Sequence, residues 1–124
     1  MNTMVRITPL DPVGNDERGY TCEYFHERMG RHLVIFRKAG TISGNHYHKG
    51  LSLTKSPEIL ILLSGQATLR YGNIQEPKIA SIDIIVPSKI EIDAYVWHEI
   101  VTITDCTFIE LGSLSEHAAD TFRV

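Results

Sequence analysis

Two histidines separated by one residue, His46 and His48, are the strongest chemical signal in the sequence. On an extended strand, residues two apart project to the same face, so both imidazoles point one way while Tyr47 points away. Two neutral imidazoles placed together can bind a transition-metal ion. Such a pair also arises by chance or from core packing, so its interpretation depends on the surrounding residues.

Two further residues extend this pair to a candidate set of four ligands. Glu58 opens the apolar run 59–63, where a carboxylate is costly unless it is paired or bound to a cation. Its alternative interpretation is a strand end in solvent. His98 lies among apolar residues, and its alternative is a hydrogen-bonded core histidine. Three imidazoles and one carboxylate would bind one divalent transition metal and leave one or two coordination positions open.

The segments that carry these residues have the pattern of β-strands. Short runs rich in Ile, Val, Thr and aromatic residues alternate with turn residues, which predicts an all-β sandwich or barrel. Only residues 113–120 have a helical pattern, with Ser115 as a candidate cap. The predicted strands cover residues 20–26, 31–38, 58–63, 66–71, 82–86, 90–97, 99–104 and 107–111.

Two of these runs are apolar on both faces. In residues 58–63 the period of two places Leu60 and Leu62 on one face and three further apolar residues on the other. Residues 33–36 are similar. A barrel strand with a solvated outer face alternates apolar and polar residues instead. We therefore expect the outer faces to be covered by a second subunit, in a homodimer, or alternatively by the chain's own terminal strands.

Size and composition limit the other possibilities. A chain of 124 residues supports one core, so we expect a single domain over residues 1–124. The net charge of −3 includes no long basic run, which argues against a nucleic-acid partner. Residues 1–6 lack an apolar leader, and no run reaches membrane-spanning length. The expected location is the cytoplasm, without a membrane partner.

The two cysteines, Cys22 and Cys106, belong to no metal-binding or redox motif. We expect two reduced thiols, with a disulfide as the alternative.

The four candidate ligands resemble the metal-binding motifs of the cupin superfamily of RmlC-like jelly rolls. The first motif, G-x5-H-x-H-x(3,4)-E-x6-G, corresponds to residues 40–65. One departure is the loop of nine residues, 49–57, where the superfamily has three or four; the cost of closing a loop grows slowly with its length. Five residues fit this motif: Gly40, His46, His48, Glu58 and Gly65.

The second cupin motif is degenerate and corresponds to residues 83–101. Pro87 and His98 fit it, whereas Asp83 stands where a glycine is usual. The resemblance implies a double-stranded β-helix, or jelly-roll barrel, with a short helical C-terminal tail. It also implies that His46, His48, Glu58 and His98 are metal ligands.

Three short strings narrow the resemblance. Residues 44–48 (GNHYH), 84–87 (IIVP) and 120–122 (DTF) are similar to the C-terminal cupin domain of bacterial capsular-polysaccharide biosynthesis epimerases. Those domains bind zinc and act on nucleotide-linked 4-keto sugars. The resemblance implies zinc here, with iron, nickel or manganese as alternatives. Without a reductase half, this chain would be a stand-alone relative.

Residues that would act on a substrate are less clear from the sequence. Arg37 and Arg70 are candidates for binding a phosphate or carboxylate, with solvated strand-edge arginines as the alternative. Tyr71 would serve as an acid or base only if it faces the cavity. His117 is assigned to the solvated surface. No general base and no organic cofactor are identified.

Three functions are compatible with these observations. The first is a metal-dependent isomerase or epimerase acting on a small carbonyl compound such as a nucleotide-linked keto sugar. The second is a dioxygenase that uses Fe(II) with open coordination positions. The third is a small-ligand-binding module with a structural metal and no turnover.

Overall fold

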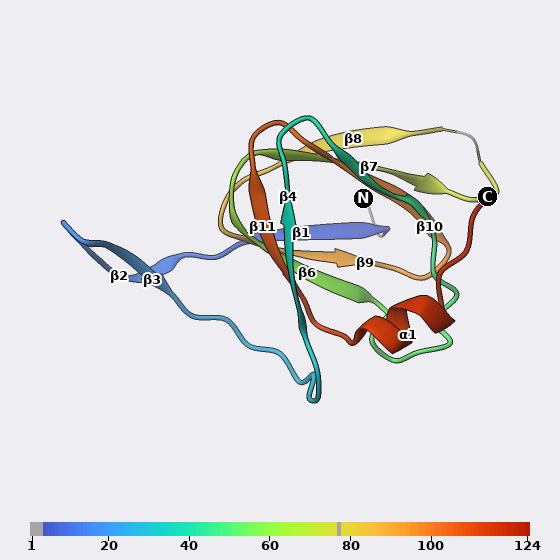
Figure 1. Ribbon diagram of the computed structural model, residues 1–124, viewed down its shortest axis with the longest axis horizontal. Coiled ribbons are helices and arrows are strands. Elements are labelled where there is room, and N and C mark those ends of the chain that lie inside the picture. Colours follow the sequence, from blue (N-terminus) through green and yellow to red (C-terminus); the bar gives the residue numbers. More distant parts are fainter. Residues whose placement is uncertain (1–3, 77) are drawn as a thin grey trace.

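Two antiparallel sheets face each other in the computed structural model, which describes residues 4–76 and 78–124 (Figure 1). The first three residues of the N-terminal stretch considered above lie outside the described residues. The strands are β1 (Val5–Pro9), β2 (Pro12–Asp16), β3 (Gly19–Cys22), β4 (Leu33–Arg37), β5 (Ile42–His46), β6 (Glu58–Ser64), β7 (Ala67–Asn73), β8 (Ala80–Ile84), β9 (Ser88–Ile92), β10 (Val96–Thr102) and β11 (Cys106–Glu110).

The larger sheet has the strand order β1-β9-β6-β11-β4, and the smaller has the order β5-β10-β7-β8. Inward side chains of both sheets form one apolar cluster, including Leu60 and Phe108 from the larger sheet and Leu69 and Ile100 from the smaller. Burying this alternating apolar set is what drives the two sheets together. The predicted all-β jelly roll is confirmed.

The chain between β9 and β10 departs from the predicted strands. The run 90–97 was expected as one strand, but β9 ends at Ile92 and β10 begins at Val96. Tyr95 turns the chain with a positive φ of 64°. After this break His98 lies inside β10, which agrees with its expected place on an apolar strand.

The outer faces of the two doubly apolar runs have different environments. On β6, Ile61 is fully buried and packs with Leu111 and Leu10, so this strand is covered within the chain. On β4, Val34 and Phe36 keep 78% and 53% of their surface exposed. The within-chain cover therefore applies to β6 and not to β4.

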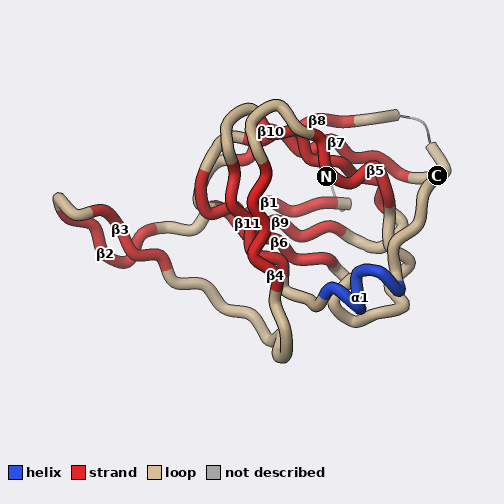
Figure 2. The backbone as a smooth tube through the Cα atoms, viewed as in Figure 1, coloured by secondary structure: helices blue, strands red, loops and turns tan. Residues whose placement is uncertain are grey.

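A hairpin of β2 and β3 projects away from the two sheets (Figure 1). Every residue of β2 is exposed. Figure 2 shows that a long loop returns from this hairpin to β4, which is an edge strand of the larger sheet. The hairpin and loop expose Tyr20, Phe25 and Met29.

The C-terminal helix α1 spans Leu114–Ala119. Its N-cap is Ser113, not Ser115: the Ser113 hydroxyl accepts from the Glu116 amide, and the Glu116 carboxylate accepts from the Ser113 amide. This reciprocal pair satisfies two amides that the first turn leaves free. In the described part of the chain, no helix has the length and apolar character needed to cross a membrane. Cys22 and Cys106 are both free thiols.

Candidate metal centre and cavity

Strand pairing places His46 directly opposite His98. The β5–β10 register pairs these two residues and then shifts, so that Glu99 faces Gly44 and Asn45 is left over in a β-bulge. Gly44 has a φ of 101°, and a Cβ atom there would lie 2.9 Å from the carbonyl oxygen of His98. Residue 44 therefore has to be glycine, and the bulge sets the direction of the His46 side chain.

Extended backbone continues from β5 to His48. Tyr47 and Phe122 exchange two backbone hydrogen bonds of 2.9 Å, which hold this segment against the C-terminal residues. The rings of His46 and His48 lie on the same side, with centroids 4.9 Å apart. The ring of Tyr47 lies on the other side, against Phe122 and Tyr95.

Glu58 joins these histidines despite the long loop that precedes it. Its carboxylate is buried, with Oε2 2.7 Å from His48 Nε2 and Oε1 3.4 Å from His98 Nε2. The rings of His46 and His98 are 4.8 Å apart. The ligand atoms of His46, His48 and His98 thus lie within 4.8 Å of one another, and Glu58 joins this group through His48 and His98.

The hydrogen bonds of the imidazoles indicate whether a metal would fit. His48 Nδ1 lies 2.6 Å from the Asp120 carbonyl oxygen, and His98 Nδ1 lies 3.0 Å from the Val96 carbonyl oxygen. A carbonyl only accepts, so each Nδ1 carries a proton, and the neutral form of either ring has its lone pair on Nε2. Both Nε2 atoms are buried without a hydrogen-bond partner and face the Glu58 carboxylate. A cation between these lone pairs would remove their mutual repulsion, and this set of donor atoms fits a divalent metal.

Lys55, which the sequence analysis did not identify, belongs to the same cluster. Its side chain is fully buried. Its Nζ donates to Glu58 Oε2 at 2.6 Å, to Glu110 Oε2 at 2.7 Å and to His117 Nδ1 at 2.8 Å. The loop 49–57 therefore places an ammonium group beside the predicted ligands, and none of its residues lines the cavity described below.

His117 was assigned to the solvated surface, and the structure contradicts this. The residue lies on α1, and its ring centroid is 5.4 Å from that of His46 and 5.5 Å from that of His48. The polar sequence around it suggested a solvent-exposed tail. The helix packs against the loop 49–57 instead, where the Ser52 hydroxyl donates to Glu116.

The surroundings of these groups set their charges. Burial, together with the neighbouring His98 and His48, lowers the pKa of His46 to about 3. Burial and the charge of Lys55 lower the pKa of His117 to about 4. Both imidazoles are therefore uncharged at neutral pH, the form that can bind a metal or accept a hydrogen bond.

Burial acts to raise the pKa of both buried carboxylates, Glu58 and Glu110, yet their net pKa shifts are opposite. Burial acts to raise the pKa of Glu58, but its contacts with His48, His98 and Lys55 outweigh that effect and hold the pKa well below its usual value. Burial and the neighbouring charge of Glu58 raise the pKa of Glu110, with Lys55 opposing them. Glu58 is thus the carboxylate that stays negatively charged.

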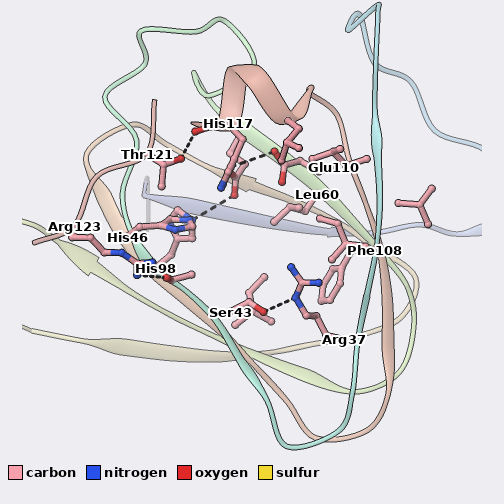
Figure 3. A pocket seen from close by; sticks show the side chains of 17 residues that line it. Arg37, Ser43, His46, Leu60, His98, Phe108, Glu110, His117, Thr121 and Arg123 are labelled. Atoms are coloured by element: carbon pink, nitrogen blue, oxygen red, sulfur yellow. Dashed lines mark hydrogen bonds and ion pairs between the residues drawn. The ribbon is translucent and has the colours of Figure 1, made fainter. Parts of the chain in front are cut away.

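A cavity of about 520 Å³ opens beside the cluster. Its polar wall includes His46, His98 and His117, and its apolar wall includes Leu60 and Phe108. Figure 3 shows these side chains directed toward a common space. This volume is within the range of small-molecule sites, which combine an apolar lining with a few polar groups.

Two arginines line this cavity. Arg37 donates to the Ser43 hydroxyl, and Arg123 donates to the carbonyl oxygens of Gly44 and Asn45. In Figure 3, Arg123 lies on the side of His46, whereas Arg37 lies on the side of Ser43. Arg123 was missed because nothing in the C-terminal sequence indicates that it returns to β5.

The other two predicted substrate residues lie elsewhere. Arg70 forms an ion pair with Glu99, and Tyr71 is buried in the apolar core between the sheets. Neither is among the residues that line the cavity. Of the three predicted substrate residues, only Arg37 lines the cavity.

No protein-family model and no curated protein matches the sequence. Solved structures do. The sugar 3,4-ketoisomerase QdtA from Thermoanaerobacterium thermosaccharolyticum, solved with TDP, superposes with a TM-score of 0.76 and 21% identity, over 100% of this chain and 90% of QdtA. A 3,4-ketoisomerase from Helicobacter canadensis has a TM-score of 0.69 and 20% identity, over 97% of this chain and 90% of its own.

The chain has the cupin fold. The capsular polysaccharide assembling protein CapF from Staphylococcus aureus is also similar to it, with a TM-score of 0.62 and 22% identity, over 94% of this chain and 32% of CapF. The predicted cupin resemblance is confirmed at the level of the fold. A variant of QdtA was solved with TDP-4-keto-6-deoxyglucose.

Proposed function

We propose that this cupin is an isomerase or epimerase acting on the keto group of a nucleotide-linked sugar. The observation that carries the proposal is the cluster of imidazoles and a carboxylate beside a cavity that also holds two arginines. Structural neighbours that are keto-sugar isomerases support the substrate class.

The reaction moves a proton on a carbon beside a carbonyl group, so negative charge develops on the carbonyl oxygen. His46, His48, Glu58 and His98 would hold a divalent metal, zinc or alternatively iron, nickel or manganese, which when bound supplies Lewis-acid stabilisation of that charge. His117 lies outside this set. Because its Nδ1 accepts from Lys55, its proton stays on Nε2, from which it can donate a hydrogen bond to a substrate oxygen.

The arginines would bind the nucleotide part of the substrate. A guanidinium group binds phosphate through paired hydrogen bonds, and Arg37 and Arg123 line the cavity into which the sugar must enter. The apolar wall would pack against the sugar and limit the access of water to the reacting carbon.

The test is proton exchange at the carbon next to the carbonyl. Wild-type protein is incubated with TDP-4-keto-6-deoxyglucose in D2O, and deuterium incorporation is followed by NMR. We expect incorporation by wild type, loss of at least about a hundredfold in His46→Ala/His48→Ala, and unchanged exchange in Arg70→Met, whose side chain lies outside the cavity. Arg37→Met should raise KM more than it lowers kcat.

The alternatives give different outcomes in the same preparation. Iron together with oxygen uptake would favour the dioxygenase. A tightly held metal without exchange on any keto-sugar nucleotide would favour a binding module. Metal analysis of wild type and His46→Ala/His48→Ala therefore accompanies the exchange assay.

We also propose a homodimer and a cytoplasmic location. The dimer is supported by the exposed apolar face of β4 and by the exposed apolar residues of the projecting hairpin and loop. The cytoplasmic location is supported by the proposed substrate, since enzymes act on nucleotide-linked sugars in aqueous solution. Cell fractionation tests the location.

A further inference from the structure

The buried ammonium group of Lys55 carries a further inference about the candidate metal centre. All three of its hydrogens are used, by Glu58, Glu110 and His117 at 2.6, 2.7 and 2.8 Å. The lysine side chain has no exposed surface, and the two carboxylates are buried as well. A full set of short contacts on a buried ammonium shows that the surrounding fold is built around this charge.

Charge balance explains what the lysine does. Glu58 and Glu110 would bring two negative charges into the interior, and buried carboxylates without a partner are strongly unfavourable. Lys55 contacts both of them through one nitrogen. The same turn of chain supplies the lysine and the glutamate, because an isolated bridge pairs Lys55 with Glu58.

The lysine and a metal would use the same atom. Glu58 Oε2 accepts from Lys55 and is also the oxygen that lies 2.7 Å from His48 Nε2. A metal bound by His48 and Glu58 would therefore draw on an oxygen already engaged by an ammonium group. It would also place a second positive charge beside Lys55, and like charges this close repel one another.

We propose that Lys55 is an internal counter-ion of Glu58, which stabilises the metal-free site and weakens the binding of a divalent ion. The inference rests on the proposed metal centre. The opposite role, in which Lys55 orients Glu58 for the metal, predicts the opposite change in affinity when the lysine is removed.

The test compares zinc affinity, measured by competition with a chromophoric chelator, in wild type and Lys55→Met. We expect the zinc Kd to fall by at least about tenfold in the variant. The metal-free variant should melt at a lower temperature than wild type, and zinc should raise its Tm by more. Lys49→Met is the matched control, because Lys49 lies on the same loop, is exposed, and stacks on Phe122 rather than binding Glu58. Its zinc Kd should stay within about twofold of wild type.

A second variant keeps the test decisive if Lys55→Met folds poorly. Lys55→Met/Glu110→Gln removes one positive and one negative charge together, so it should fold without metal and still bind zinc more tightly than wild type. Unchanged or weaker zinc binding in both variants would overturn the inference, as would failure of both to fold when zinc is present.

Zinc binding by wild type separates this inference from the function on which it rests. If wild type binds zinc and Lys55→Met binds it no better, the counter-ion role alone is rejected. If wild type and all variants bind no divalent metal, the metal centre itself is rejected, and the inference with it.

Discussion

Gly44 decides where one of the candidate ligands points. Its positive φ and its close approach to β10 both exclude a side chain, and the β-bulge that it forms with Asn45 sets the direction of His46. The residues next to Gly44 in the sequence do not explain why a glycine stands at this position. The reason is a backbone contact with His98, which is 54 positions further along the chain.

Gly44→Ala should therefore destabilise the protein and disturb the site. A left-handed backbone costs alanine about 1–2 kcal/mol, and the contact with the His98 carbonyl oxygen brings the expected loss to about 3 kcal/mol. Urea unfolding at pH 7 measures it. Gly30→Ala is the control, because Gly30 also has a positive φ but no atom within 4 Å of its would-be Cβ. An equal loss in both variants would show that the contact with His98 is unimportant.

At the scale of elements, the C-terminal residues hold the long loop after His48. The carboxylate of Asp120 is buried and accepts from the amides of Lys49 at 2.8 Å and Ser52 at 3.1 Å. The Asp120 carbonyl oxygen accepts from His48 Nδ1. Asp120 thus orients the candidate ligand His48 and also fixes the start of the loop that carries Lys55.

Removing this carboxylate should weaken both the loop and the site. In Asp120→Ala two partly buried amides lose a charged acceptor, for an expected loss of about 3 kcal/mol in the free energy of unfolding. Asp120→Asn keeps one acceptor oxygen and should lose roughly half as much. Thermal and urea unfolding measure the stability, and amide hydrogen exchange at Lys49 and Ser52 reports the loop. Unchanged protection of these amides in Asp120→Ala would contradict the prediction.

At the scale of the whole molecule, the exposed apolar face of β4 supports a second subunit. Light scattering after gel filtration should give a mass twice the 14.0 kDa of one chain. Val34→Lys/Phe36→Lys places charges on this face, which is 78% and 53% exposed at the two residues, and should shift the mass to that of one chain. Ile103→Lys, 58% exposed in the turn after β10, is the control. A monomeric wild type would reject the dimer.

The sequence alone predicted those features that depend only on residues close together in the chain. The period of two along a strand indicated that His46 and His48 share a side, and the apolar run after Glu58 indicated a buried carboxylate with a cationic partner. Repeated short apolar runs indicated an all-β fold, because strand periodicity and turn residues are local properties. The same period of two indicated that residues 33–36 carry apolar side chains on both faces.

Only the tertiary structure decided which distant residues complete the site. Lys55 lies in a polar loop and His117 in a polar tail, and neither segment shows an apolar period that would mark it as buried. Their side chains meet because Asp120 holds the loop and α1 packs against it. Strand register placed His98 opposite His46, since pairing between β5 and β10 is a long-range choice that no local pattern specifies.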